Sequence, residues 1–170
     1  TGFVINQADF ADVDNDGYLD LLVAGNPARK DKYRSGLLLL HNDGQGKYTD
    51  TSNSLPSELE IIEQVKTADM DSDGDLDIII INDQGNVRIM RNDGGNLNNY
   101  LKVRLAGLRT GSSKNNYFGF GSKVEVKSGG LYQMRHVDKA VSHFGLGNRD
   151  RADVVRVLWS NGVPQNRFTP

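Results

Sequence analysis

The sequence predicts an all-β fold, and three features of the chain carry the prediction. Asn, Asp and Gly make up 53 of the 170 residues, and these residue types tolerate left-handed backbone and close tight turns. Short runs rich in Val, Ile and Leu lie between the turn residues, which is typical of strands rather than helices. An acidic block also occurs twice, as in proteins built from a repeated supersecondary unit.

The acidic block occupies residues 11–20 (ADVDNDGYLD) and returns 57 residues later at 68–77 (ADMDSDGDLD). Each copy is followed by a short apolar run, and then by a second run that ends in an Asn-Asp-Gly turn. The first copy is longer by seven residues, which places an insertion around residues 26–35. We expect this insertion to be a solvated loop.

The apolar runs predict strands along both halves of the chain. The runs of the second half at 100–105 and 122–127 alternate with period two, as strands with one buried face do. In chain order the predicted strands lie at residues 21–24, 37–40, 78–81, 87–90, 100–105, 122–127 and 154–159.

Charge divides the chain into two predicted domains. Residues 1–94 carry 18 acidic and 8 basic side chains, whereas residues 95–170 carry 4 acidic and 12 basic ones. Such an asymmetry indicates two units of different character, and the change falls at an Asn-Asp-Gly-Gly-Asn turn or linker. We therefore predict a first domain of two repeats, about 1–53 and 54–94, and a second domain at 95–170.

The acidic loops have the spacing of a calcium site. Carboxylates occupy positions 1, 3, 5 and 9 of each loop, and Gly occupies position 6, where a sharp turn is needed. The backbone carbonyl at position 7 can add a further oxygen, which approaches the 6 to 8 oxygen ligands that calcium takes. The predicted ligands are Asp12, Asp14, Asp16, Tyr18 and Asp20 in the first loop, and Asp69, Asp71, Asp73, Asp75 and Asp77 in the second.

Calcium is favoured over other ions by ligand type. Magnesium demands a tighter octahedron and keeps more water, and zinc prefers His or Cys, neither of which lies within the loops. Carboxylates that converge without a cation repel one another, so a solvated turn is the weaker interpretation. We predict two calcium sites.

An EF-hand would place an acidic residue at position 12 and continue into a helix. Position 12 here is Val23 or Ile80, within a predicted strand. With the last carboxylate at position 9 and a strand directly after it, residues 3–94 resemble two FG-GAP/VCBS repeats, the calcium-bearing blades of integrin-type β-propellers. The resemblance implies two blades of a partial propeller. Because a propeller needs about 4 to 8 blades to close, we expect the chain to be part of a longer polypeptide.

The second half has its own characteristic sequence. Glycines precede a Lys-Val-x-Val strand at residues 119–126, and HFGLG (143–147) and WSNG (159–162) follow in order. Residues 97–167 resemble the ASPIC/UnbV domain, which follows such repeats in cartilage acidic protein-like secreted proteins. This resemblance implies a small β-rich domain and carries over no catalytic residues. The segment between Gln133 and His143 is shorter than is usual in that family.

No enzymatic site is predicted. The chain has no Cys, and its three His residues are scattered. Ser142 and His143 lack a nucleophile elbow, and no complete dinucleotide or phosphate-binding loop is present. We expect His143 to pack in a turn. The basic residues of the second half can bind an acidic glycan or nucleic acid, but solvated strand faces that meet the acidic half are favoured.

The combined prediction is a calcium-binding, non-enzymatic binding or cell-adhesion module for an extracellular protein or glycan. The alternative is an accessory region of a larger secreted polysaccharide-active enzyme. We expect a secreted or extracellular location, with the cell surface or the periplasm as variants, and no nucleic-acid partner. Membrane insertion is not expected, because the longest apolar runs, 37–40 and 78–81, are far below the ~18 residues that span a bilayer.

Overall fold

The computed structural model describes residues 2–27, 35–57, 59, 61–108 and 115–168. Most of the predicted insertion therefore lies outside the described residues. The fold is all-β, as predicted, with two single-turn 3₁₀ helices, η1 (Ser52–Ser54) and η2 (Gly95–Leu97). No helix in the described ranges has the length and apolar character needed to cross a membrane.

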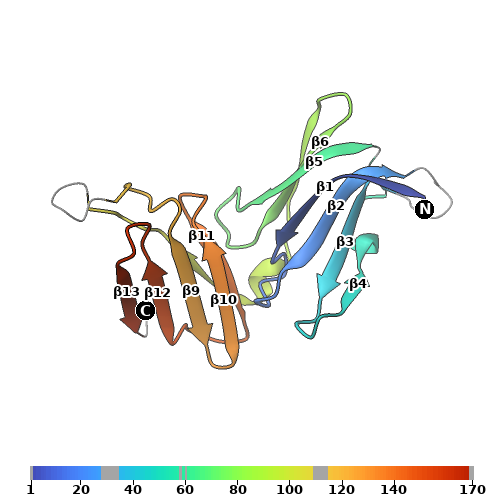
Figure 1. Ribbon diagram of the computed structural model, residues 1–170. Coiled ribbons are helices and arrows are strands. Elements are labelled where there is room, and N and C mark those ends of the chain that lie inside the picture. Colours follow the sequence, from blue (N-terminus) through green and yellow to red (C-terminus); the bar gives the residue numbers. More distant parts are fainter. Residues whose placement is uncertain (1, 28–34, 58, 60, 109–114, 169–170) are drawn as a thin grey trace. The chain divides into compact units, whose positions relative to one another are not determined.

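The strands lie in two compact units, which Figure 1 draws from blue to green and from orange to red. The first unit contains residues 1–14 and 18–97, and the second contains Asn15–Gly17 and Asn98–Pro170. Strands of the first unit are β1 (Phe3–Ala11), β2 (Asp20–Pro27), β3 (Leu37–Asn42), β4 (Tyr48–Asp50), β5 (Ile62–Ala68), β6 (Asp77–Asn82) and β7 (Val87–Met90). Strands of the second unit are β8 (Asn99–Val103), β9 (Lys123–Ser128), β10 (Leu131–His136), β11 (Ser142–Gly147), β12 (Val154–Leu158) and β13 (Pro164–Phe168).

The two repeats form two antiparallel sheets of the same design. The first is a four-stranded meander in the order β1-β2-β3-β4, and the second has the order β5-β6-β7. The register of the first hairpin shifts between Ile5 and Gln7, and that of β5 and β6 shifts between Ile62 and Gln64. Corresponding bulges thus occur at the same place in both repeats, which supports the interpretation of the repeat as one structural unit.

One apolar core joins the two sheets of the first unit. The apolar runs supply it, because β2 and β6 carry consecutive Val, Ile and Leu residues that are buried or half-buried. Polar contacts between β1 and β5 add to it: the Asn6 side chain donates to the Ile62 carbonyl at 3.0 Å, and the Val65 amide donates to Gln7 Oε1 at 2.9 Å. The core residues are Ala11, Leu22, Ala24, Leu37, Leu39, Leu59, Ile62, Val65, Ile78 and Ile80.

The second unit has a separate core. A four-stranded antiparallel sheet in the order β10-β9-β12-β13 accompanies the two-stranded pair β11-β8. Strands β9 and β12 both alternate between buried valines and more accessible residues, and the sequence predicted this period for β9. The core residues are Leu105, Val124, Val126, Val137, Phe144, Leu146, Ala152, Val155 and Val157.

All seven predicted apolar runs lie wholly or mostly in strands. Strands β1, β4, β5, β10, β11 and β13 were not predicted from the sequence. Polar residues interrupt them, as in β1 (FVINQADFA) and β5 (IEQVKTA), so that no continuous apolar run marks them.

Candidate metal centre

Each acidic loop connects the first two strands of its sheet. The loop ends are paired across the hairpins, Ala11 with Asp20 and Ala68 with Asp77. Strand β1 or β5 enters the loop, and β2 or β6 leaves it at the ninth position. Position 12 therefore lies within a strand in both copies, as predicted, and the loop is held at both ends by a sheet.

The two loops share an unusual backbone. Position 4 is left-handed in both, with φ of 58° at Asn15 and 68° at Ser72, and position 6 has φ of 99° at Gly17 and 106° at Gly74. The left-handed backbone favours glycine at Gly17, and a Cβ there would also displace the Leu131 side chain, whose Cδ2 would lie 2.5 Å away. The repeated acidic sequence thus encodes one loop conformation twice.

The position-9 carboxylates clamp the loops. Asp20 accepts the amide of Val13 at 3.2 Å and that of Asn42 at 2.9 Å, using one oxygen for each. Asp77 accepts the amides of Met70 and Asn92 in the same way, both at 2.9 Å. Both carboxylates are buried. They have a structural function in addition to any function as metal ligands.

Burial raises the pKa of Asp20 above its ordinary value of 3.8. The hydrogen bonds from the Asn42 and Val13 amides oppose this effect, and the nearby Asp14 carboxylate adds to it. A carboxylate that is desolvated beside another one is a favourable place for a divalent cation, because the cation stabilises the charged form.

The second loop brings together the carboxylates of Asp69, Asp71 and Asp73, at positions 1, 3 and 5. One oxygen of each lies within 4.8 Å of the other two. Hydrogen bonds within the loop orient them, because the Gly74 amide donates to Asp69 Oδ2 at 3.1 Å and the Asp73 amide donates to Asp71 Oδ1 at 3.3 Å. A side-chain hydrogen bond with Asp75 lowers the pKa of Asp73. This oxygen-only set fits a hard cation such as calcium.

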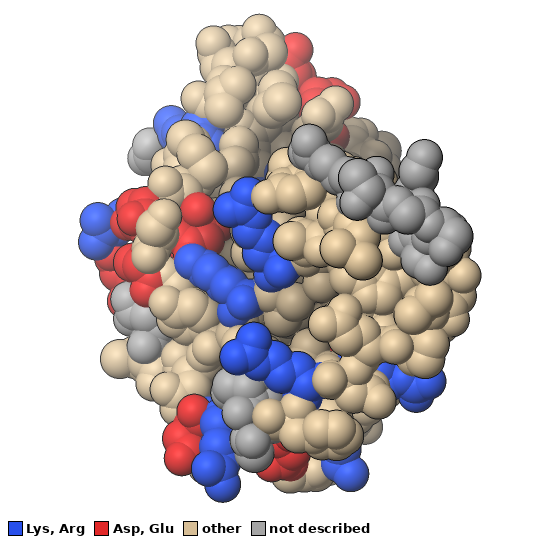
Figure 2. Space-filling model, turned by 90° about the vertical axis from the view of Figure 1, so that its left-hand side faces the viewer, with Lys and Arg blue, Asp and Glu red and all other residues tan. Residues whose placement is uncertain are grey.

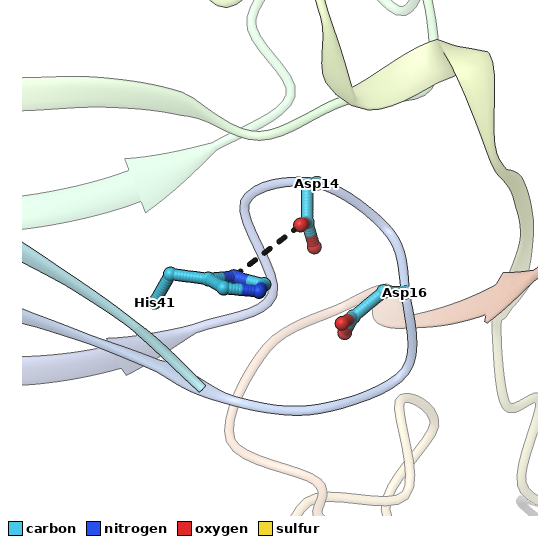
Figure 3. Close-up of side chains that lie close together, drawn as sticks. All are labelled: Asp14, Asp16 and His41. Carbon is cyan, nitrogen blue, oxygen red and sulfur yellow. Dashed lines mark ion pairs between the residues drawn. The ribbon is translucent and has the colours of Figure 1, made fainter. Parts of the chain in front are cut away.

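The first loop brings together a different set. The carboxylates of Asp14 and Asp16, at positions 3 and 5, lie within 4.8 Å of a ring nitrogen of His41, which comes from β3. Figure 3 shows the three side chains pointing into the same space inside the loop. Sequence reasoning missed His41, because it considered only residues within the loop.

The remaining predicted ligands lie in the loops but outside these two groups. Asp12 and Asp75 are both buried. For Asp75, the predicted ligand atom was the backbone carbonyl oxygen. The Tyr18 ring lies beside Gly44, since a Cβ on that glycine would come within 2.4 Å of it. The assignment of Asp12, Tyr18, Asp20, Asp75 and Asp77 as ligands stays a prediction.

Two asparagine side chains hold the ends of the acidic loops in place. The sequence analysis predicted these asparagines only as turn residues. Asn42 Nδ2 donates to the Leu19 carbonyl at 3.0 Å, and Asn92 Nδ2 donates to the Leu76 carbonyl at 3.3 Å. Each thus fastens the end of an acidic loop to the Asn-Asp-Gly turn of the same sheet. The signal that reveals them is the recurrence of Asn-Asp-Gly after the third strand of both repeats.

The tip of the first loop belongs to the second unit. The Gly147 amide donates to the Asn15 carbonyl at 2.7 Å, and His143 Nε2 lies 2.6 Å from Asn15 Oδ1. The His143 ring also stacks on Tyr100, with ring centroids 5.4 Å apart. The sequence analysis expected His143 to pack in a turn; His143 lies within strand β11, and its ring contacts Asn15 in the bend at the loop tip.

Comparison with known families agrees with this architecture. Residues 12–80 match the FG-GAP-like repeat, and residues 111–169 match the family described as ASPIC and UnbV. The chain therefore joins an FG-GAP-like repeat region to an ASPIC and UnbV domain, as the sequence analysis predicted. This is the architecture of a β-propeller-type extracellular module, and FG-GAP repeats are typical of extracellular or surface proteins. No curated protein matches the chain.

Proposed function

We propose that this chain is part of a calcium-stabilised extracellular binding module with no enzymatic activity of its own. The observation that carries the proposal is the pair of acidic loops, which have the same left-handed positions and the same carboxylate clamp. FG-GAP repeats are often calcium-binding, and the oxygen-only group in the second loop has the ligand chemistry that calcium prefers.

Calcium would act on stability. Carboxylates held close together repel one another when the loop is formed without a cation. An ion that binds only the formed loop stabilises the folded state, by about 2.7 kcal/mol for each site at a free concentration of 100 Kd. The ion would thereby rigidify the hairpins that carry the loops.

A calcium titration tests this part of the proposal. We expect calorimetry on the chain to give two calcium equivalents, and we expect the melting temperature to rise with free calcium relative to chelator. Magnesium at the same concentration serves as the control for ionic strength and charge. Melting curves that coincide in calcium and in chelator would contradict the proposal.

The second unit offers a partner surface on its four-stranded sheet. Paired residues of an antiparallel sheet point to the same side, so the register defines three rows across the accessible face. Tyr132 and Phe168, 61% and 70% exposed, end the first row. The rows are Tyr132, Lys127, Val154 and Phe168; then Met134, Glu125, Arg156 and Asn166; then His136, Lys123, Leu158 and Pro164.

The chemistry of this sheet face fits an anionic glycan. The face has a net positive charge, because three of its residues are Lys or Arg and one is Glu. The Glu125 carboxylate lies 3.7 Å from Arg156. Its exposed aromatic side chains can pack against sugar rings, since aromatic groups bury large areas with few rotatable bonds. Lys and Arg side chains also gather across the surface shown in Figure 2.

Binding to a sulfated polysaccharide, with its uncharged parent polymer as the control ligand, tests this surface. We expect the chain to bind dextran sulfate but not dextran, and to bind less well as salt increases. The double variant Lys123→Ala, Lys127→Ala should weaken binding. The double variant Lys47→Ala, Arg88→Ala removes the same charge from the first unit and should leave binding unchanged. Equal losses in the two variants would show that only net charge matters and would overturn the assignment of the face.

A further inference from the structure

The three rows of the basic sheet face contain one acidic side chain, that of Glu125. It lies in the middle row, where the register places Met134 of β10 on one side of it and Arg156 of β12 on the other. Lys123 and Lys127 flank it along β9, each two residues away. A negative charge therefore lies between the cationic side chains of the face.

The Glu125 carboxylate is contacted from both neighbouring strands. Arg156 Nη1 lies 3.7 Å from Glu125 Oε2, and the Glu125 side chain is 28% exposed. Desolvation raises the pKa of Tyr132 on β10, and Glu125 adds to this rise through its charge and a side-chain hydrogen bond, whereas the charge of Arg156 opposes it. These two contacts hold the carboxylate in position and keep it accessible to a ligand.

The spacing of the lysines around Glu125 suits a ligand with separated anionic groups. A strand rises about 3.3 Å per residue, so the Cα atoms of Lys123 and Lys127 are roughly 13 Å apart, with Glu125 halfway between them. This separation exceeds the Debye length of about 10 Å at 0.1 M salt. Each lysine therefore attracts an anionic group largely by itself, and an anionic group between the two meets the Glu125 carboxylate.

The chemistry of Glu125 favours an uncharged stretch of sugar at this point. An ionised carboxylate has only acceptor oxygens, so it accepts hydrogen bonds from sugar hydroxyls but repels sulfate and carboxylate groups. The exposed Tyr132 ring on the neighbouring strand can pack against the same uncharged stretch. The face thus distinguishes polyanions by the distance between their charges.

We propose that Glu125 is a specificity-determining residue of this sheet face, which selects an acidic polysaccharide with widely spaced anionic groups over a densely charged one. This inference rests on the proposed function, since it concerns the choice of ligand at the same face. Lys123 and Lys127 bind two anionic groups of the polymer, and Glu125 accepts hydrogen bonds from the hydroxyls between them. A densely charged polymer places an anionic group against Glu125 and is bound less well for that reason.

Dextran sulfates of low and high degree of sulfation provide the test, because they share one backbone and differ in charge density. We expect Glu125→Gln to bind the highly sulfated polymer about two- to fivefold more tightly than the chain does, as for the loss of one exposed like-charge contact. Its affinity for the sparsely sulfated polymer should be unchanged or lower. Glu125→Lys should increase the gain for the highly sulfated polymer further.

Asp138→Asn is the matched control, because it removes one exposed acidic charge from the same unit, outside the strands of the sheet. Both of its affinities should equal those of the chain. An equal gain for both polymers in Glu125→Gln would show that only net charge matters and would overturn the inference. A gain in Asp138→Asn as large as that in Glu125→Gln would overturn it as well.

The double variant Lys123→Ala, Lys127→Ala separates this inference from the proposed function. If that variant binds both polymers as tightly as the chain does, the proposed face is wrong and the inference fails with it. If the double variant binds less well while Glu125→Gln shows no gain for the highly sulfated polymer, the inference alone fails.

Discussion

Aspartates of one loop occupy very different environments, and these define different tasks. Asp77 is 1% exposed, and each of its oxygens accepts a backbone amide. The Asp71 side chain is 36% exposed and lies near two other carboxylates. The first residue holds the loop together with or without an ion, whereas the second lies beside two other carboxylates, with Arg91 3.5 Å away, and is placed to bind an ion. The first loop repeats the clamp at Asp20.

Substitution of these two aspartates should separate the two tasks. In chelator, Asp77→Asn should lower the free energy of unfolding by about 1–3 kcal/mol, because an amide cannot accept at both positions and leaves one buried N–H without its acceptor. Asp71→Asn should leave stability in chelator unchanged or higher, and should weaken calcium binding at one site only. Chemical unfolding in chelator and calorimetry with calcium provide the measurements. Equal losses of stability in chelator would contradict the assignment.

The raised pKa of Asp20 predicts how calcium stabilisation depends on pH. An acid whose pKa is higher in the folded chain contributes stability below its unfolded value near 3.8, and this contribution is lost as pH rises through the folded pKa. Calcium reverses the sign by stabilising the charged form. The difference in melting temperature between calcium and chelator should therefore shrink as pH falls from 7 towards 4. A difference that is constant over this range would argue against Asp20 as part of the site.

At the scale of the elements, the two sheets of the first unit are joined by polar contacts at the bulges as well as by the core. Gln7 follows the bulge of β1 and accepts the Val65 amide of β5 at 2.9 Å. The Asn6 side chain reaches the Ile62 carbonyl beside it. A bulge re-aims the side chains next to it, and here those side chains meet the neighbouring sheet. These two hydrogen bonds join side chains of β1 to backbone groups of β5, and so they hold the two sheets at a fixed position along each other.

Gln7→Ala should destabilise the first unit by about 1 kcal/mol or somewhat more, because it leaves the Val65 amide without this acceptor. Gln64→Ala is the matched control, since Gln64 lies at the corresponding bulge of β5 and is exposed. Hydrogen exchange at the Val65 amide should accelerate in the first variant only. Equal exchange rates in both variants would show that the contact contributes nothing.

The elements also show what the sequence could and could not predict. Ile78 to Ile81 form a continuous apolar run that predicted β6, because one face of that strand is buried and the other is half-buried. Strand β5 has one buried face and four polar residues among seven. Its sequence therefore contains no apolar run from which the strand could be predicted. The carboxylate spacing predicted both loops, since it lies within a few residues. His41 reaches the first loop from another strand, and such a contact depends on strand pairing that one sequence does not reveal.

At the scale of the whole molecule, charge follows the division into units. Residues 1–94, which supply nearly all of the first unit, have a net charge of −10, and residues 95–170, which supply most of the second, have +8. Two bound calcium ions would reduce the first value only to −6. Each unit buries its own apolar core. The acidic half of the sequence therefore carries the predicted metal ligands, and the basic half carries the sheet face proposed for an anionic partner.

The assignment of Asn15–Gly17 to the second unit has a consequence for the order of folding. That unit draws its parts from two places in the chain separated by 80 residues, and closing a free loop of that length costs roughly 4 kcal/mol of chain entropy. The first unit removes most of this cost once it has folded, because Asn92 Nδ2 donates to the Val13 carbonyl at 2.7 Å and so holds the departing chain beside the loop. Folding of the N-terminal repeats during synthesis thus lowers the entropy cost of bringing Asn15–Gly17 to the strands of their own unit.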